Sequence, residues 1–306
     1  MNYAIETTYV PNLGKGLYPE EYESNSCKNS TSSNSPEKPD SSPSYEYTNE
    51  IPYVKNLVFP ASTAKPHVNL FTGDAHYPFA DERITRLICN FKEWLKPDSH
   101  IRVGDYFDFY QLSKFSINPL RSANLQSDID TGTRGIKLEC EASPDTDEYL
   151  ILGNHCHRLQ RFLWDTPKIS QLRGNRFDVL TGTGKLGVKL ASYEDGLMIN
   201  DVYLARHGEL IRKYSGWTAK AHYEKHGGNG IVGHSHRGGH YTKRDRFGVW
   251  GWAENFCLCD LNPEYVSCPD WQHGFTIQTW FSNHQYIIEQ IPIINYRFIY
   301  GGKVFD

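Results

Sequence analysis

VNLFTGDAH, residues 68–76, is the stretch of sequence that decides the fold. In it an apolar, partly β-branched run is followed by a glycine and then by Asp74 and His76, an order typical of a buried strand that ends in a polar loop. The pattern recurs after the runs HIRV, YLIL, VYLA and GIV, with the polar clusters Gly104-Asp105, Gly153-Asn154-His155, His207-Gly208 and Gly233-His234-Ser-His236. Helical periodicity appears between several of these runs, so the sequence predicts an α/β fold.

Two stretches have the periodicity of helices. In residues 80–95 the apolar side chains recur at three- and four-residue steps, and Pro97 ends the pattern. The second helix is expected over residues 213–226, and it closes at Gly227, where a left-handed C-terminal cap is favoured. After Trp250 the density of aromatic and β-branched residues rises, which predicts antiparallel strands that close the sheet.

The N-terminal part of the chain has a different composition. Residues 24–45 consist largely of Ser, Asn and Pro, and such a polar segment buries too little apolar surface to offset the entropy lost on ordering. We therefore expect residues 1–66 to be a flexible tail and residues 67–306 to form one domain. The 39% hydrophobic content of the 306-residue chain is enough for a core of that size.

Composition also limits the function classes. The 32 basic and 36 acidic residues give a net charge near −4, so the overall charge predicts no strong attraction to nucleic acid or to membranes. The seven cysteines are odd in number and irregularly spaced, unlike a disulfide framework. The sequence has neither a secretory leader pattern nor an apolar run of the ~18 residues that cross a bilayer. We expect a soluble cytoplasmic protein that does not bind membranes.

The five polar clusters are expected to converge, because ligands gather at the carboxyl ends of strands in open α/β sheets. The glycines beside them let the backbone turn sharply and keep bulk away from the site. Mixed oxygen and nitrogen donors suit two divalent metal ions, for which we expect Mn(II), with Fe or Zn(II) as alternatives. Such a pair needs about seven or eight protein ligands, one of them a shared carboxylate, here Asp105. The candidate ligands are Asp74, His76, Asp105, Asn154, His207, His234 and His236.

These five clusters resemble, in order and spacing, the motifs of the calcineurin-like metallophosphoesterases, and the similarity covers about residues 68–292. The resemblance implies a four-layer α/β/β/α sandwich with a dinuclear metal site at the carboxyl ends of strands. One metal would be held by Asp74, His76, Asp105 and His236, and the other by Asp105, Asn154, His207 and His234. A metal-bridging hydroxide would then attack the phosphoester.

The resemblance also implies two catalytic residues outside the ligand set. His155 would protonate the leaving-group oxygen or stabilise the transition state, paired with Asp108, because a carboxylate on an imidazole favours its proton-donating form. The third motif departs from the family's pattern at Cys156, where an acidic residue is usual, and we expect altered support of the ligands there.

Segments such as residues 215–220, 259–266 and 271–275 resemble a subgroup common in bacteriophages and their hosts, often labelled phosphoesterase or DNA repair exonuclease. If the chain is phage-encoded, its compartment would be the host cytoplasm. This subgroup favours a nuclease-like phosphodiesterase that acts on DNA or RNA. A protein or small-molecule phosphomonoesterase is the alternative within the enzyme class. A catalytically silent relative that serves as a binding scaffold, with protein partners unknown, is the alternative of another class.

Several further residues have two interpretations. Basic residues near the motifs could line a groove for a phosphate backbone or be solvated loop charges. They are Arg158, Arg161, Lys168 and Arg173, and a second group of Arg237, Lys243, Arg244 and Arg246. Cys257 and Cys259 face the same side of a predicted strand, and we expect a buried apolar role for them, because they lack the partner pair of a structural zinc site.

Overall fold

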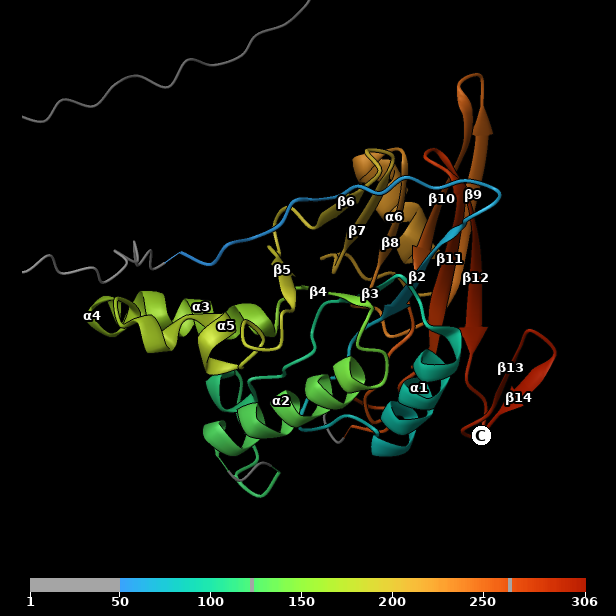
Figure 1. The fold of residues 1–306 in the computed structure, drawn as a ribbon. Coiled ribbons are helices and arrows are strands. Elements are labelled where there is room, and N and C mark those ends of the chain that lie inside the picture. The colour runs from blue at the N-terminus through green and yellow to red at the C-terminus, as the bar shows by residue number, and fades with distance from the viewer. Residues whose placement is uncertain (1–49, 122–123, 264–265) are drawn as a thin grey trace, which may run out of the picture. The chain divides into compact units, whose positions relative to one another are not determined.

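The computed structural model describes residues 50–121, 124–263 and 266–306, and within them two six-stranded sheets form the centre of the molecule (Figure 1). The first sheet has the order β12-β11-β2-β3-β4-β5 and consists of β2 (His67–Thr72), β3 (Ser99–Val103), β4 (Asp147–Ile151), β5 (Lys189–Ala191), β11 (Gly274–Ser282) and β12 (Gln285–Pro292). The second has the order β1-β6-β7-β8-β10-β9 and consists of β1 (Asn56–Leu57), β6 (Leu197–Ile199), β7 (Tyr203–Arg206), β8 (Asn229–Val232), β9 (Gly239–Asp245) and β10 (Gly248–Glu254). The strands that precede the five polar clusters are β2, β3, β4, β7 and β8, and they pair in parallel within each sheet.

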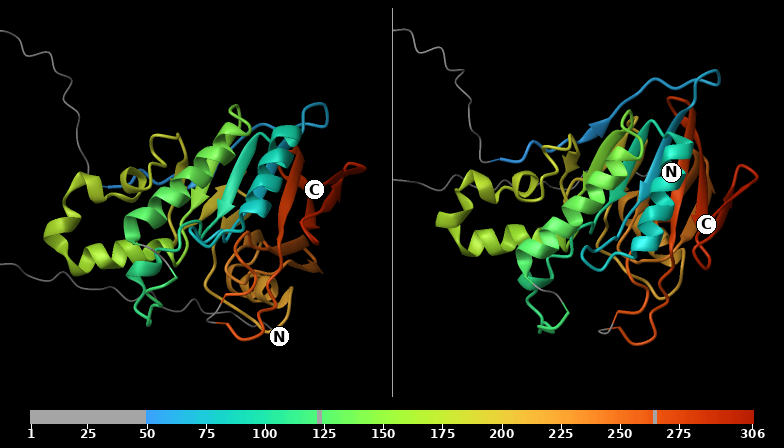
Figure 2. Two further views of the ribbon diagram at one scale, coloured as in Figure 1. Left: turned by 90° about the horizontal axis from the view of Figure 1, so that it is seen from below. Right: turned by 60° about the horizontal axis from the view of Figure 1, so that its bottom comes forward.

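Helices cover the outer faces of both sheets (Figure 2). The helices are α1 (Glu82–Leu95), α2 (Leu125–Glu141), α3 (Cys156–Asp165), α4 (Pro167–Ser170), α5 (Phe177–Leu180) and α6 (Trp217–His226), with 3₁₀ turns η1 (Tyr110–Leu112) and η2 (Arg173–Asn175). A short hairpin, β13 (Phe298–Tyr300) and β14 (Lys303–Phe305), follows β12. No helix in the described part of the chain is long and apolar enough to cross a membrane.

The alternation of side chains along the strands produces the four layers. Leu70 of β2 belongs to the core beneath α1 and α2, whereas its neighbour Phe71 belongs to the core between the two sheets. In the second sheet, Ile231 of β8 faces the inter-sheet core and Val232 packs under α6. Successive side chains of a strand point to opposite faces, so each strand contributes to two cores. The predicted α/β/β/α sandwich is confirmed.

The two predicted helices exist, but both begin later than expected. Helix α1 begins at Glu82 because the Asp81 side chain accepts hydrogen bonds from two backbone amides of the first turn. Helix α6 begins at Trp217, after Gly216 in a left-handed conformation, and it ends at Gly227 with φ of 67°. Residues 213–215, which belong to the predicted helix, precede Gly216 and lie outside the helix of the structure.

Ordered structure begins before the expected boundary at residue 67. Strand β1 pairs in parallel with β6, and Leu57 and Phe59 are buried in the inter-sheet core. Residues 1–49, the remainder of the expected flexible tail, lie outside the described part of the chain.

A buried ionic network fastens α1 and α2 to the first sheet. Arg102 of β3 is fully buried, and its guanidinium lies 2.6 Å from Oε2 of Glu139 on α2 and 2.8 Å from Oε2 of Glu148 on β4. Lys92 of α1 contacts the other oxygen of Glu148 and donates to the backbone carbonyl of Glu139 at 2.6 Å. The two cations and two carboxylates balance, so no net charge is buried.

Replacing Glu148 by Gln should lower the free energy of unfolding by about 3 kcal/mol, because it leaves Arg102 and Lys92 buried with one carboxylate fewer. Burial opposes ionisation of Glu148, but Arg102, His100 and Lys92 outweigh it and lower its pKa. The stabilisation is therefore complete above the ordinary pKa of 4.5 and is lost as the pH falls below it. Urea unfolding of both proteins across this pH range measures the effect.

Glu141→Gln is the matched control. Glu141 is an exposed residue that pairs with Lys137 at 3.6 Å, and an exposed pair contributes roughly 0.5 kcal/mol or less. Equal destabilisation by the two substitutions would contradict the importance of the buried network.

Candidate metal centre

All seven predicted ligands lie in the loops that follow β2, β3, β4, β7 and β8, and the described residues form overlapping clusters there. Three groups have ligand atoms within 4.8 Å of one another. They are Asp74, His76 and His236; His76, Asp105 and His155; and Asp105, His207 and His234. The first sheet supplies the clusters around Asp74, Asp105 and Asn154, and the second sheet supplies those around His207 and His234.

The first cluster surrounds the carboxylate of Asp74. Its Oδ1 lies 3.4 Å from Nε2 of His236 and 3.8 Å from Nε2 of His76. The Nε2 atoms of these two imidazoles are 3.1 Å apart. Oδ2 of Asp105 completes the group at 4.0 Å from Nε2 of His76.

The second cluster surrounds Asp105 and His207. Nε2 of His207 lies 3.0 Å from Oδ2 of Asp105 and 2.9 Å from Oδ1 of Asn154. The ring of His234 lies edge-on to that of His207, with centroids 4.9 Å apart. Asp105 therefore contributes to both clusters through the same oxygen, as expected of a shared ligand.

Five of the seven predicted ligands have a left-handed backbone. The φ angles are 50° for Asp74, 52° for His76, 38° for Asp105, 68° for His234 and 58° for His236. A side chain in this region costs roughly 1–3 kcal/mol, and it persists only where the surrounding structure enforces it. Such residues concentrate at functional sites.

The glycines beside the ligands are required by close packing between loops. A Cβ atom on Gly153 would lie 2.1 Å from Oδ1 of Asp105, and one on Gly104 would lie 2.2 Å from Nδ1 of His207. A Cβ on Gly233 would lie 2.6 Å from Oδ2 of Asp74. Each glycine thus admits a ligand that comes from another loop.

Neighbouring acceptors fix the orientation of two imidazoles. Nδ1 of His76 donates to Oδ2 of Asp108 at 2.9 Å, and Nδ1 of His207 donates to the carbonyl oxygen of Val103 at 3.1 Å. Both rings therefore present Nε2 to the cluster. An acceptor on the remote ring nitrogen is the usual companion of a metal-bound histidine.

Electrostatics at the site favour positive charge. Burial disfavours ionisation of Asp105, but His207, His155 and His76 outweigh it and hold its pKa well below the ordinary value. Burial likewise opposes protonation of His207, yet Asp105 and Asp74 raise its pKa to about 9. Burial and His207 lower the pKa of His234 to about 4, which leaves that imidazole neutral. Buried carboxylates and imidazoles that converge on one volume form a donor set that divalent ions of the Mn, Fe or Zn class fit.

His155 and Asp108 form the predicted pair. Nδ1 of His155 lies 3.0 Å from Oδ2 of Asp108, and its backbone amide donates to Oδ1 of Asp105 at 2.8 Å. Asp108 has a further function that the sequence did not indicate, because the same Oδ2 also accepts from His76.

Arg158 joins this pair. One guanidinium nitrogen donates to Oδ1 of Asp108 at 2.8 Å, and the other lies 3.2 Å from Nε2 of His155. The helical spacing of His155 and Arg158 brings both side chains to Asp108.

The remaining sequence predictions have mixed outcomes. Arg237 is buried and bonded to the carbonyl oxygens of Arg212 and Lys213 and to Asp270, so it does not line a phosphate groove. Arg161, Lys168 and Arg173 are exposed on α3, α4 and η2, as are Lys243, Arg244 and Arg246 on or next to β9. Cys156 begins α3 and is buried, with its Sγ 3.8 Å from the carbonyl oxygen of Phe107.

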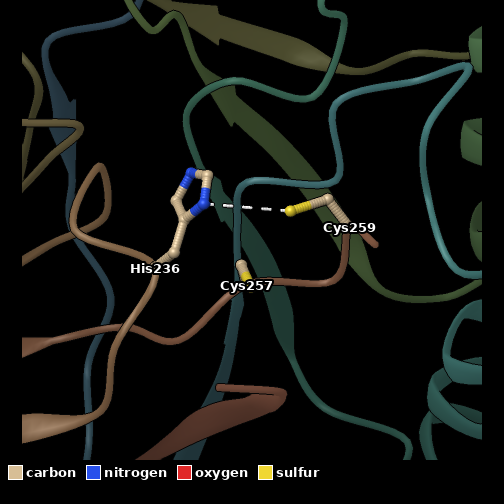
Figure 3. Close-up of side chains that lie close together, drawn as sticks. All are labelled: His236, Cys257 and Cys259. Carbon is tan, nitrogen blue, oxygen red and sulfur yellow. Dashed lines mark hydrogen bonds between the residues drawn. The ribbon is translucent and has the colours of Figure 1, made fainter. Parts of the chain in front are cut away.

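Cys257 and Cys259 are buried as expected, but their surroundings are not purely apolar. Sγ of Cys259 lies 3.8 Å from Nδ1 of His236 (Figure 3). The sequence carried one signal for this contact, the two-residue spacing that places both thiols on one side of an extended segment.

Among solved structures, the chain is similar to Vacuolar Protein Sorting 29 from Cryptosporidium parvum, with 9% identity and a TM-score of 0.38 over 78% of this chain and 94% of that one. It is also similar to a purple acid phosphatase from yellow lupin seeds, with 11% identity and a TM-score of 0.30 over 76% of this chain and 52% of that one. No protein-family model matches the sequence, and no curated protein matches it either. These likenesses are too distant to carry an argument about function, which therefore rests on the side-chain geometry.

Gly153→Ala should weaken Mn(II) binding by at least about 10-fold, because the new methyl group overlaps the Asp105 carboxylate. Isothermal titration with Mn(II) measures the affinity, and circular dichroism should show an unchanged fold. Gly174→Ala is the control, since a Cβ there meets nothing within 4 Å. Unchanged affinity in the Gly153 variant would contradict the placement of Asp105 in the metal centre.

Proposed function

We propose that this protein is a metal-dependent phosphoester hydrolase with a dinuclear centre, a member of the metallophosphoesterase superfamily. The observation that carries the proposal is the pair of ligand clusters that share Asp105 and lie beside the His155–Asp108 pair. A shared carboxylate between two clusters suits two ions, and a separate imidazole–carboxylate pair suits proton transfer.

Each of the two clusters would hold one ion. Asp74, His76, Asp105 and His236 would hold one ion, and Asp105, Asn154, His207 and His234 the other. Once bound, the two ions would supply positive charge to the phosphoryl oxygens and lower the pKa of a coordinated water that attacks phosphorus. The donor set favours Mn(II), with Fe or Zn(II) as alternatives.

His155 is positioned to move a proton at Nε2. Nδ1–H of His155 donates to Asp108, and Nε2 lies 4.0 Å from Oδ2 of Asp105 and accepts from Arg158 at 3.2 Å. When the guanidinium turns to a substrate oxygen, Nε2 is free to carry a proton. The side chain is 17% exposed, so a substrate can reach it. A leaving-group oxygen close to Nε2 would take this proton as the ester bond breaks.

Arg158 can assist by binding the substrate. Its guanidinium is held by Asp108 through one nitrogen, and its second nitrogen faces Nε2 of His155. A planar guanidinium fixed by a carboxylate is pre-organised to hydrogen-bond an anionic oxygen. We therefore assign Arg158 to the orientation of the phosphoryl group or of the leaving group next to His155.

A cavity of about 550 Å³ adjoins these residues and supports a substrate with a large leaving group. Asp108, His155 and Arg158 line it, together with the apolar side chains of Phe115 and Ile117. An aromatic or nucleoside leaving group would contact these apolar side chains while its ester oxygen faces His155. The cavity favours phosphodiesters, including those of nucleic acid, over monoesters with small leaving groups.

Two other functions are compatible with the same fold. A protein or small-molecule phosphomonoesterase would use the same centre on a substrate that leaves part of the cavity unfilled. A catalytically silent binding scaffold would retain the fold without turnover. The ionisable pair beside the ligands favours the enzyme over the scaffold, because a scaffold has no need of a proton donor there.

The protein loaded with Mn(II) should hydrolyse bis(p-nitrophenyl) phosphate. Asp105→Asn should lose bound metal and activity together, since it weakens the ligand common to both clusters. His155→Ala should keep its metal and lose kcat by roughly 100-fold, because it removes only the proton donor. Release of p-nitrophenolate and elemental analysis of the same samples measure both quantities.

His284→Ala is the control for the histidine substitution, because His284 is exposed in the turn between β11 and β12. A metal-loaded wild-type protein with no turnover on this diester, on p-nitrophenyl phosphate or on nucleic acid would favour the scaffold. Turnover unaffected by His155→Ala would remove His155 from the mechanism and leave the metal centre standing.

Phe115→Ala should raise KM for bis(p-nitrophenyl) phosphate roughly 5-fold with little change in kcat, because about 1 kcal/mol of aromatic contact with the leaving group is lost. Phe115 is an exposed side chain at the cavity, and Phe247, exposed at the turn of the β9–β10 hairpin, provides the matched control. Steady-state kinetics on both variants measure the difference. An equal effect of the two substitutions would place the leaving group elsewhere.

A further inference from the structure

One group of metal-ligating atoms lies beside the candidate metal centre and takes no part in the proposed reaction. Nδ1 of His236 and the Sγ atoms of Cys257 and Cys259 all lie within 4.8 Å of one another. Figure 3 shows a ring nitrogen of His236 facing the Cys259 sulfur, with Cys257 on the same segment as Cys259. The three side chains are 6%, 0% and 3% exposed, so bulk water does not compete strongly for them.

We propose that His236, Cys257 and Cys259 form a second site, which shares the His236 ring with the metal centre, for a thiophilic divalent ion of the Zn²⁺ and Cd²⁺ class. Two thiolates and one imidazole are a donor set that such ions prefer, whereas hard ions such as Mn(II) and Mg(II) bind thiolates weakly. The inference does not depend on phosphoester hydrolysis, because it concerns ligand atoms that the proposed reaction leaves unused.

The distances fit tetrahedral coordination after small adjustments. Bond lengths of about 2.3 Å to sulfur and about 2.0 Å to nitrogen imply a sulfur–nitrogen separation of roughly 3.5 Å at a tetrahedral ion. Nδ1 of His236 and Sγ of Cys259 are 3.8 Å apart. Sγ of Cys257 lies within 4.8 Å of both atoms and 3.5 Å from the carbonyl oxygen of Gln272, so it exchanges that contact for the ion on binding.

The segment that carries the cysteines is held on both sides. The backbone of Cys257 forms an isolated β-bridge with that of His273, and the Cys257 amide donates to the carbonyl oxygen of Gln272 at 3.1 Å. The backbone of Cys259 forms an isolated β-bridge with that of Ala80, and the Cys259 carbonyl oxygen accepts from Nε2 of His273 at 2.8 Å. The ring of Trp271 packs on that of His236 with centroids 4.1 Å apart. These contacts pre-organise the ligands, so that binding orders few additional groups.

The charge balance permits an ion in this buried volume. Each thiol releases its proton as the metal–sulfur bond forms, and two thiolates neutralise the divalent ion. Nε2 of the same imidazole faces Oδ1 of Asp74 at 3.4 Å, so a ring that binds this ion through Nδ1 keeps its one proton on Nε2 and donates it to Asp74. An ion at this site and an ion bound by Nε2 in the metal centre therefore compete for His236. The simpler interpretation is a hydrogen bond between the Cys259 thiol and His236 with no ion involved, and the experiment must separate the two.

Cadmium binding tests the proposal, because cadmium–thiolate bonds absorb in the ultraviolet through charge transfer and cadmium held by oxygen and nitrogen alone does not. Titration of the full-length reduced protein with Cd²⁺ should produce this band with a stoichiometry of one ion per chain. Cys257→Ser and Cys259→Ser should each weaken the binding that produces the band by at least about 10-fold. Cys268→Ser, at an exposed position, should leave it unchanged.

Asp105→Asn separates this proposal from the hydrolase proposal, because it disables the dinuclear centre and leaves all three thiophilic ligands in place. The band should survive in Asp105→Asn. A wild-type protein without the band, or a Cys257→Ser/Cys259→Ser protein that retains it, would overturn the site. If the cysteine variants fail to fold, the ¹¹³Cd resonance of the wild-type protein decides, since a shift typical of oxygen and nitrogen donors alone would equally exclude it.

Discussion

The Asp105 carboxylate is the group on which the rest of the site depends. Oδ1 accepts the backbone amide of His155 at 2.8 Å, and Oδ2 faces His207 at 3.0 Å and His76 at 4.0 Å. It is reached only because Gly153 has no side chain. Three loops therefore meet on one carboxylate, and the position of each constrains the other two. This mutual constraint explains how the chain maintains several left-handed residues that would be unfavourable in isolation.

Beneath these loops, the structure is stabilised by two different means. The space between the sheets is apolar, with Phe71, Ile101 and Ile231 among its members. The space between the first sheet and its helices also contains the ionic network of Arg102, Glu139, Glu148 and Lys92. Directional charge contacts fix the relation of α1 and α2 to the strands more closely than apolar contacts alone would. Because Arg102 lies on β3, which ends two residues before Asp105, the network supports the strand that delivers the shared ligand.

The sequence pattern predicted an α/β fold and the meeting of the loops, because apolar runs followed by polar clusters repeat along the chain. The four layers were implied by the resemblance to the calcineurin-like metallophosphoesterases and not by the pattern itself. The pattern did not predict where helices start, since Asp81 and Gly216 set those positions through local hydrogen bonding and backbone conformation. Contacts such as those of Asp108 with His76 and of Cys259 with His236 could not be read from the sequence either. They depend on the register between loops far apart in the chain, which no local pattern encodes.

The division of the candidate ligands between the two sheets has a consequence for the whole molecule. Asp74, Asp105 and Asn154 belong to one sheet, and His207, His234 and His236 belong to the other, so neither sheet alone can complete either cluster. A slight slide of one sheet over the other would change the spacing between donors even if every loop kept its shape. The affinity for a bound ion would then depend on how the apolar residues between the sheets pack. A substitution in that core could change the affinity although it contacts no ligand.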